Sequence, residues 1–257
     1  MDKVRIAVHK FSSCDGCQLA FLNLGETLLE LAGQVEIAHF AEAGLLDEQA
    51  EVDIAFVEGS LSTEADRERI RAIRKRSRVL VTLGACAASG GLQALRNLSG
   101  GGWMQAVYPS PEYIDSLDQV APVSAEVRVD LELWGCPVNR HQVLTAVRAL
   151  MFGVLPADRR DALCLACKRA RQVCVMVARG EPCMGPVTRT GCGAICPSVG
   201  RGCYGCYGPD ENPNTEALTR RFEGLGLVSR QIADRFHGIN SQAPAFLEAG
   251  RRAREKP

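Results

Sequence analysis

The sequence is poor in several features that would point to common functions. Its 257 residues carry 30 Lys and Arg against 30 Asp and Glu, so the net charge is zero, and only 5% of the residues are aromatic. A nucleic-acid-binding surface needs an excess of basic residues, so we expect no nucleic-acid partner. No apolar run approaches the roughly 18 residues that span a bilayer, so we expect no membrane span.

The N-terminus also lacks a targeting segment. Its first residues, MDKVRIAVHKF, run directly into an alternating apolar segment. The charged region, long apolar stretch and cleavage site of a secretory leader are missing, and so is a twin-arginine signal. We therefore expect a soluble, cytoplasmic protein. In a reducing cytosol, numerous cysteines indicate metal binding rather than disulfide bonds.

Cysteine, by contrast, is abundant. The chain has 12 cysteines in two kinds of cluster. Four are scattered through the first half, at Cys14, Cys17, Cys86 and Cys136. The other eight fall within 43 consecutive residues, at Cys164, Cys167, Cys174, Cys183, Cys192, Cys196, Cys203 and Cys206. Twelve divides into three sets of four thiolates, the number that holds one 4Fe–4S cluster. The sequence therefore predicts three 4Fe–4S clusters.

Residues 1–155 alternate strand and helix signals, as an α/β domain does. Apolar segments predict strands at Val4–His9, Val35–Phe40, Asp53–Val57, Arg78–Leu83 and Arg128–Trp134. Helical spacing and capping signals predict helices at Leu19–Leu31, from the capping box Thr63-x-x-Asp66 to Arg76, and at Asn139–Phe152. This order predicts a parallel sheet with helices on both faces. Residues 85–129, which contain the glycines at 90–91 and 100–102, are expected to be mostly loop.

After Pro156 the pattern changes. Apolar periodicity fades, while glycine, proline and cysteine become frequent. Such a segment cannot bury enough apolar side chains to fold alone, so residues 156–257 are predicted to form a small irregular domain with metal as its core. Short helices are expected at Asn214–Glu223 and Gln242–Arg254.

Each of the first four cysteines follows a predicted strand. Cys14 and Cys17 come after the first strand, Cys86 ends the run VLVTLGAC, and Cys136 lies in LELWGCP. Loops that leave the carboxyl ends of parallel strands share one edge of the sheet, so these thiols are predicted to meet there. Two other interpretations remain. Cys86 and Cys136 can be buried structural cysteines, or Cys14 and Cys17 can form a thioredoxin-like redox pair, which leaves the other two unexplained.

The spacing of the other eight cysteines predicts two further sites. We assign Cys164, Cys167, Cys174 and Cys183 to one cluster, and Cys192, Cys196, Cys203 and Cys206 to the other. Cys196-Pro197 is similar to the Cys-Pro end of ferredoxin motifs, where the last cysteine ligates the neighbouring cluster, so exchange of ligands between the two sites stays open. Structural zinc is the main rival. However, 35 residues separate Cys167 from Cys203, more than the roughly 15–20 of a zinc ribbon.

Other polar motifs carry less information. The four histidines show no paired spacing and are expected to be structural. Gly200-x-Gly202-x-x-Gly205 neither follows a predicted strand nor opens a helix, so it does not predict a dinucleotide site, and no cofactor besides the clusters is expected. Glu58 ends a predicted strand at the same sheet edge as the first cysteines. It is predicted either to accept backbone N–H bonds in the Val57–Ser60 turn or to join an interface network or proton path.

Ordered motifs along nearly the whole chain resemble the small subunit of nickel–iron hydrogenases. They are Phe11-Ser-Ser-Cys-Asp-Gly-Cys-Gln-Leu19, Val57-Glu-Gly-Ser60, Leu83-Gly-Ala-Cys86, Gly135-Cys-Pro137, Met184-Gly-Pro-Val-Thr188, Gly191-Cys-Gly-Ala194 and Cys203-Tyr-Gly-Cys206. The sequence resembles in particular the delta subunit of cytoplasmic, multimeric NAD(P)-linked hydrogenases, also called sulfhydrogenases.

The resemblance implies a flavodoxin-like domain whose proximal cluster is held by Cys14, Cys17, Cys86 and Cys136. Medial (Cys192, Cys196, Cys203, Cys206) and distal (Cys164, Cys167, Cys174, Cys183) clusters would follow. Hydrogen would be split at a nickel–iron centre in a separate large subunit, and this chain would supply no catalytic residue. Electrons would pass to flavin- and NAD(P)-binding and iron–sulfur subunits, as in a hydrogen:NAD(P)+ oxidoreductase, with sulfur reduction as a further activity left open.

Two positions depart from periplasmic members of that family. Cys164 stands where they use histidine, and Cys196 stands where they have proline. All-cysteine ligation keeps more negative charge on a cluster, so low reduction potentials are expected. Three alternative functions remain: a respiratory complex I subunit, which carries adjacent cysteines in the first motif and lacks the eight-cysteine segment; a coenzyme F420-linked hydrogenase small subunit; and a zinc-binding interaction module. The terminal acceptor and the physiological direction stay open.

Overall fold

The computed structural model describes residues 3–100 and 102–256. Gly101 of the predicted glycine-rich loop, and the residues 1, 2 and 257 at the outer ends of the two predicted domains, lie outside this description. The chain divides into two compact units, Met1–Leu133 with Pro137–Pro156, and Trp134–Cys136 with Ala157–Pro257. Each unit is described by itself below.

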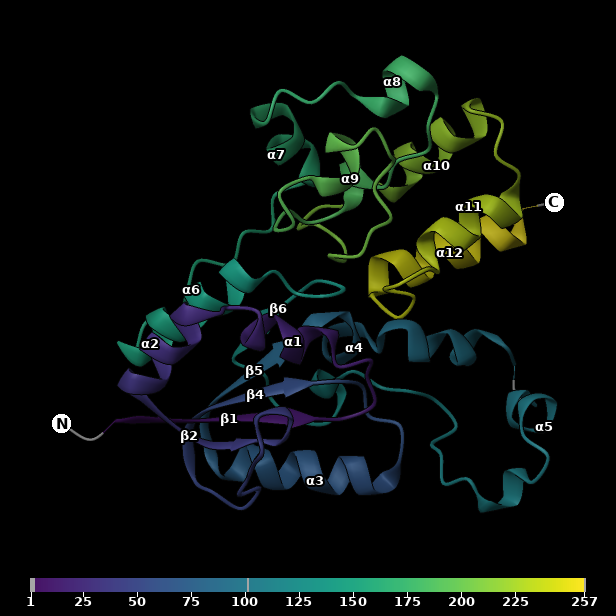
Figure 1. Ribbon diagram of the computed structural model, residues 1–257. Coiled ribbons are helices and arrows are strands. Elements are labelled where there is room, and N and C mark those ends of the chain that lie inside the picture. The colour runs from purple at the N-terminus through teal and green to yellow at the C-terminus, as the bar shows by residue number, and fades with distance from the viewer. Residues whose placement is uncertain (1–2, 101, 257) are drawn as a thin grey trace. The chain divides into compact units, whose positions relative to one another are not determined.

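The first unit is built on a six-stranded sheet in the order β3-β2-β1-β4-β5-β6 (Figure 1). The strands are β1 Val4–Lys10, β2 Val35–Phe40, β3 Leu45–Leu46, β4 Val52–Glu58, β5 Ser77–Leu83 and β6 Leu131–Leu133. All neighbours pair in parallel except β3, which runs antiparallel to β2. The five parallel strands follow the flavodoxin-like order 2-1-3-4-5, so the predicted α/β fold class is confirmed. The two-residue β3 was not predicted.

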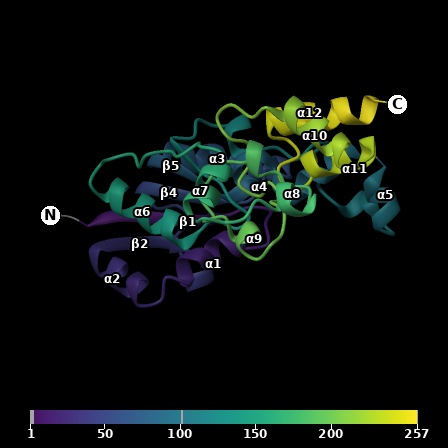
Figure 2. The ribbon, with the colours of Figure 1, turned by 90° about the horizontal axis from the view of Figure 1, so that it is seen from above.

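Helices cover both faces of this sheet. On one face α1 (Gly16–Leu22), α2 (Glu26–Gln34) and α6 (Arg140–Met151) close an apolar core that includes Phe21 and Phe56. On the other, α3 (Glu64–Lys75) and α4 (Gly84–Ser89) close a second core. Figure 2 looks down on the strands, and α3 lies on the opposite face from α1 and α2 in Figure 1. Successive residues of a strand point to opposite faces of the sheet. Because both faces are buried here, the central strands are apolar along most of their length.

Local signals explain where these helices begin and end. The capping box predicted at Thr63 is present, with the Thr63 hydroxyl accepting from the Asp66 N–H and the Asp66 carboxylate accepting from the Thr63 N–H. The single helix predicted over Leu19–Leu31 is wrong. The structure has two helices there, because the chain turns at Gly25, whose φ of +58° suits glycine.

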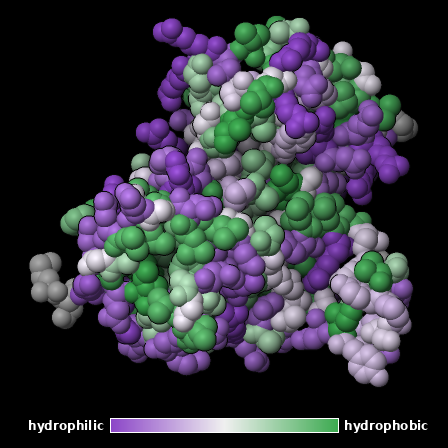
Figure 3. Space-filling model, viewed as in Figure 1, coloured by the Kyte–Doolittle hydropathy of each residue, from purple (hydrophilic) through white to green (hydrophobic). Residues whose placement is uncertain are grey.

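The segment between β5 and β6 is more helical than predicted. It contains η2 (Gly91–Leu98), α5 (Trp103–Val107), η3 (Pro111–Tyr113) and η4 (Val123–Ala125) after α4, all short. The predicted strand Arg128–Trp134 shrinks to Leu131–Leu133. The part around α5 exposes Val107 and Tyr113, and Figure 3 shows hydrophobic residues on its surface at lower right.

The second unit contains little regular structure around its cysteines and more toward its end. The short elements are α7 Leu163–Arg169, α8 Val175–Arg179, η5 Gly185–Val187 and α9 Ile195–Ser198. Three longer helices follow, α10 Thr215–Gly224, α11 Ser229–Phe236 and α12 Pro244–Glu255. The predictions of α10 and α12 are confirmed to within two residues, whereas α11 was missed. Phe222, Phe236 and Phe246, one from each of these helices, are fully buried.

The helices of the described residues are all too short or too polar to cross a membrane.

Candidate metal centres

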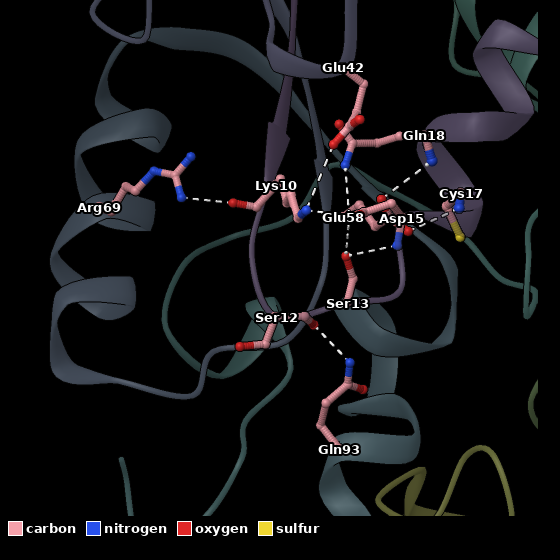
Figure 4. Close-up of polar contacts among 10 residues, drawn as sticks. All are labelled: Lys10, Ser12, Ser13, Asp15, Cys17, Gln18, Glu42, Glu58, Arg69 and Gln93. Atoms are coloured by element: carbon pink, nitrogen blue, oxygen red, sulfur yellow. Dashed lines mark hydrogen bonds and ion pairs between the residues drawn. The ribbon is translucent and has the colours of Figure 1, made fainter. Parts of the chain in front are cut away.

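The Cys14–Cys17 turn joins the end of β1 to the start of α1. Its middle residue, Asp15, has a left-handed φ of 65°, and its carboxylate accepts hydrogen bonds from Lys10 Nζ (2.7 Å) and Ser13 Oγ (3.1 Å) (Figure 4). Asp tolerates this backbone region better than most residues because its short side chain bonds locally. The turn is therefore held by polar contacts, with the Cys14 side chain exposed and the Cys17 side chain buried.

Glu58, the last residue of β4, ties this turn to the sheet. Its carboxylate accepts the backbone N–H of Cys17 (2.9 Å) and of Gln18 (3.3 Å), and its side chain is 1% exposed (Figure 4). Burial raises the pKa of Glu58, and these two hydrogen bonds oppose the rise. The prediction that Glu58 accepts backbone N–H bonds is right in kind but wrong in place. The donors lie in α1, not in the Val57–Ser60 turn.

The backbones that follow β1 and β4 pack tightly together. Ser12 and Ser60 form an isolated antiparallel bridge, with Ser60 N donating to Ser12 O at 2.9 Å. Gly59 has φ +100°, and a Cβ there would lie 2.5 Å from the Phe11 carbonyl carbon. Only glycine permits this approach. Gln93 Nε2 donates to Ser12 O at 3.0 Å and fixes the same loop from η2 (Figure 4).

Cys86 lies in α4, directly after β5, as its predicted place at the sheet edge requires. A Cβ at Gly91, whose φ is +59°, would lie 2.6 Å from the Cys86 sulfur. A Cβ on Gly16 would lie 3.4 Å from the Cys14 sulfur and 3.5 Å from the Pro137 side chain. Glycine at position 91 therefore leaves room beside the Cys86 sulfur that a Cβ would take up.

Cys136 itself belongs to the short segment Trp134–Cys136 that groups with the second unit. Its backbone N–H donates a hydrogen bond to the Cys206 sulfur. The Trp134 indole lies against Gly208, and the Arg189 guanidinium stacks over it at 5.0 Å from the ring centroid. These contacts fix the segment within the second unit.

In the second unit, the thiols of Cys164, Cys167, Cys174 and Cys183 lie close enough to repel one another electrostatically. The pKa of Cys164 is raised to about 11, mainly by burial, with contributions from Cys183, Cys167 and Cys174 that Lys168 opposes. A Cβ on Gly185 would meet the sulfurs of both Cys183 (3.4 Å) and Cys164 (3.6 Å). The first predicted set is thus brought together.

The thiols of Cys192, Cys196, Cys203 and Cys206 interact in the same way. Burial raises the pKa of Cys206 to about 12, with Cys192 and Cys196 adding to the rise. Burial likewise raises the pKa of Cys203 to about 12, again with repulsion from Cys206. Burial raises the pKa of Cys196, and the positive charge of Arg201 opposes this rise.

Hydrogen-bond donors are directed at these sulfurs. Gly205 N–H donates to the Cys203 sulfur at 3.3 Å, and the buried Thr188 hydroxyl lies within reach of that sulfur and of the Met184 carbonyl at 2.7 Å. Asn240, 1% exposed, donates from Nδ2 to the Gly205 carbonyl at 2.8 Å. Asn240 therefore holds the turn between Cys203 and Cys206.

Cys183 connects the two sets. Its sulfur accepts the N–H of Cys203 at 3.2 Å, and it adds to the pKa rise of Cys164, Cys196 and Cys203. Cys183 is therefore the cysteine of the first set that lies against the second, whereas Cys174 interacts with cysteines of the first set.

Comparison with known proteins adds the family. The chain matches the model of the NADH ubiquinone oxidoreductase 20 kDa subunit family over residues 14–150. It is 35% identical to sulfhydrogenase 2 subunit delta of Pyrococcus furiosus over 84% of this chain and 90% of that protein. It is 30% identical to a subunit of the F420-non-reducing hydrogenase vhu of Methanococcus voltae, over 91% and 93% of the two proteins. Among solved structures, a chain of an NAD+-reducing [NiFe]-hydrogenase aligns with TM-score 0.55 and 30% identity, covering 61% of this chain and 95% of that one.

The chain belongs to this family and is a small subunit of a nickel–iron hydrogenase. The predicted resemblance is confirmed. Small subunits of this kind are iron–sulfur, electron-transfer oxidoreductase subunits, and the match over residues 14–150 spans all four predicted proximal cysteines.

The residues of this hydrogenase small subunit fit iron–sulfur clusters. No disulfide bond joins any of these cysteines in the described residues, and each C-terminal set contains a half-buried sulfur whose pKa is raised by burial and by its neighbours. Ligand thiols must lose their protons, and bound iron supplies the positive charge that allows it. Within the described residues, no three His, Cys, Asp or Glu side chains gather closely enough to hold a single metal ion. A four-iron core spreads its thiolates more widely than one ion does.

Several residues around the clusters could not be found from the sequence. Asn240 lies 34 residues beyond the last cysteine and carries no motif, and Thr188 was noted only as part of Met184–Thr188. The Gly90-Gly91 pair predicted only a loop, although Gly91 makes room beside Cys86. These contacts depend on tertiary packing.

Proposed function

We propose that this hydrogenase small subunit relays electrons through three 4Fe–4S clusters. The proximal cluster would be held by Cys14, Cys17, Cys86 and Cys136, the medial one by Cys192, Cys196, Cys203 and Cys206, and the distal one by Cys164, Cys167, Cys174 and Cys183. The observation that carries the proposal is the gathering of thiols within each C-terminal set, close enough that each set's sulfurs raise one another's pKa in addition to the effect of burial. It is supported by the family match across the first set.

When bound, the clusters would pass single electrons between a nickel–iron site and an external acceptor. The chain's own residues would orient the ligands and tune their charge. Glu58 fixes the first turn of α1 through the N–H groups of Cys17 and Gln18. The Gly205 and Cys203 N–H groups donate to sulfurs, which withdraws charge and raises the potential relative to bare thiolates.

The N–H of Cys136 supports the order proximal to medial. It belongs to a proposed proximal ligand and donates to the sulfur of Cys206, a proposed medial ligand. The N–H of Cys203 likewise connects a medial ligand to the sulfur of Cys183, a distal one. Each pair of successive ligand sets is thus joined by one hydrogen bond within the second unit.

The partner subunits follow from the same proposal. A nickel–iron large subunit would split hydrogen, and a flavin- and NAD(P)-binding subunit with an iron–sulfur subunit would take the electrons, in the cytoplasm. The similarity to a sulfhydrogenase delta subunit and to the NAD+-reducing enzyme supports NAD(P) as acceptor. The proposal includes sulfur reduction as a further activity of the assembled complex.

The experiment uses the tagged chain purified anaerobically with its bound partners. We expect hydrogen-dependent reduction of NAD+ or NADP+, and no reduction of coenzyme F420. A Cys174→Ser variant should lose NAD(P) reduction while retaining more of the reduction of a viologen dye, because a dye can take electrons before the distal cluster. The matched control is Val173→Ser, at an exposed neighbour.

Three results would contradict the proposal. The first is a complex that reduces F420 but neither pyridine nucleotide. The second is an equal loss of NAD(P) reduction and of dye reduction in Cys174→Ser, which would mean that Cys174 is not a ligand of a distal cluster. The third is a colourless protein that carries zinc without iron, which would identify a zinc-binding module.

A further inference from the structure

The first unit has a hollow on the face of the sheet that α3 covers. A parallel crossover usually packs a helix onto the sheet. Between β2 and β4, however, residues 41–51 hold only the three-residue helix η1 (Ala41–Ala43) and β3. A cavity of about 340 Å³ lies between this segment, α3 and the end of β1. Polar side chains line most of it, where a crossover helix would have placed apolar ones.

His9 of β1 lines the cavity. It is 4% exposed, and its ring stacks on that of His39 with the centroids 4.7 Å apart. The sequence spacing of these two histidines gave no sign of this contact. The Nδ1 atom of His9 is buried and has no partner among the described residues. A buried imidazole nitrogen without a partner costs free energy, so it is a place where a bound group would be stabilised.

Two arginines of α3 and its C-terminal end, seven residues apart, line the same cavity. Arg69 donates from Nη1 to Lys10 O (2.7 Å) and from Nη2 to Glu48 Oε1 (3.0 Å) (Figure 4 shows the Lys10 contact). Arg76 donates from its two Nη atoms to Gln49 Oε1 (2.5 Å) and Glu48 O (3.3 Å). The Nε of Arg76 is buried and has no partner in the described chain. The cavity thus contains a second unused polar nitrogen, and this one can only donate.

Arg69 and Arg76 both disfavour a proton on His9. The pKa of His9 is lowered to about 3, mainly by burial, with smaller contributions from His39 and the two arginines. Two carboxylates do line the cavity. Glu48 is bonded by Arg69, and Glu68 is exposed to solvent. The two unpartnered nitrogens, Arg76 Nε and the Nδ1 of a neutral His9, can both donate a hydrogen bond, so they favour a ligand that accepts hydrogen bonds, as an oxyanion does.

We propose that this hollow binds a small oxyanion, a phosphate or carboxylate group, that accepts hydrogen bonds from Arg76 Nε and from His9 Nδ1. The neutral imidazole can carry its hydrogen on Nδ1. Arg69 contributes positive charge and pairs with the Glu48 carboxylate, which offsets the negative charge of Glu48 in the lining. The site is separate from the cysteines, so it holds whether or not the cluster assignment is correct.

The test is calorimetric titration of the full, cluster-loaded chain with inorganic phosphate and, separately, with acetate, in a buffer free of other oxyanions. We expect saturable binding of one of the two. Arg76→Gln should weaken it at least about tenfold, because a charge-assisted hydrogen bond and a charge are lost. The matched control is Arg71→Gln on α3, since Arg71 bonds Glu126 and does not line the cavity.

His9→Phe provides a second variant that keeps a ring but removes the nitrogen. It should also weaken binding, with unchanged iron content and visible absorption as evidence that the chain has folded. The proposal is overturned if neither anion saturates the site. It is also overturned if Arg76→Gln and Arg71→Gln bind equally well, which would mean that only water fills the hollow.

Discussion

The two units present their cysteines in different ways. In the first, Cys14, Cys17 and Cys86 leave the ends of strands in a sheet that closes two apolar cores of its own. In the second, residues 157–213 contain only short helices, and buried sulfur side chains such as Cys183, Cys203 and Met184 occupy their interior. The cysteines of the first unit are therefore attached to a scaffold that apolar burial stabilises. The cysteine-rich part of the second unit depends for its stability on the metal that its thiols bind.

The largest expected effect is that of removing iron. Anaerobic chelation should unfold the cysteine-rich segment, since its raised thiol pKa values reflect burial and, to a lesser extent, repulsion between the thiols, and no metal then offsets either. The sheet should survive. Hydrogen exchange measured by mass spectrometry should show lost protection over residues 162–207 and retained protection in β1, β4 and β5. An equal loss of protection in both regions would contradict the claim that only the cysteine-rich segment depends on iron for its fold.

A second prediction tests the scaffold alone. Gly59→Ala should destabilise the first unit by about 2–4 kcal/mol, because the new Cβ would lie 2.5 Å from the Phe11 backbone at a φ of +100°. Chemical denaturation of the chain measures the effect. Gly33→Ala is the matched control, since Gly33 lies in α2 with nothing near its Cβ position, and alanine should stabilise that helix by about 0.5–1 kcal/mol. Similar losses in the two variants would refute the close-approach argument.

A third prediction concerns the second unit. Asn240→Leu should cost about 1–3 kcal/mol, because the buried Gly205 carbonyl loses its partner. It should also change the EPR spectrum of the cluster that we propose is held in part by Cys203 and Cys206. Asn212→Ala, at an exposed position, should change neither. An unaltered spectrum in Asn240→Leu would show that Asn240 does not position that turn.

The smallest expected effect is the pH dependence of the sheet unit. The pKa of His9 is lowered to about 3 from its ordinary 6.5. The unfolded chain therefore binds a proton below pH 6.5 that the folded chain does not, and stability falls as the pH drops, by about 1.4 kcal/mol per pH unit. His9→Gln should flatten this slope between pH 7 and pH 5 in an oxyanion-free buffer. A variant with the wild-type slope would assign the effect to other groups.

The sequence was sufficient to predict the architecture of the first unit and to name every candidate ligand. Strands such as Val35–Phe40 were predicted because an apolar run between turn residues has few other structures available. The break at Gly25 was missed because helical apolar spacing continues across it. The partner of Glu58 was missed because it is distant in sequence, 41 residues away, and no local pattern encodes it.

The hollow over His9 likewise depends on contacts between residues that are distant in the sequence. His9 and His39 have no spacing that suggests a pair, yet the parallel pairing of β1 with β2 brings their rings together. The sequence could not predict the hollow either, because it depends on the missing crossover helix between β2 and β4. Pairwise contacts between strands are set by the topology and become visible only in the fold.

The central claim is that every thiol of this chain ligates a four-iron cluster, four to each. Mössbauer spectroscopy of the iron-57-enriched chain, together with an iron count, tests it most directly. We predict about twelve iron atoms per chain, all with the spectrum of 4Fe–4S clusters. A three-iron medial centre, or an iron count of roughly eight with four cysteines reactive toward alkylating reagents, would contradict the account.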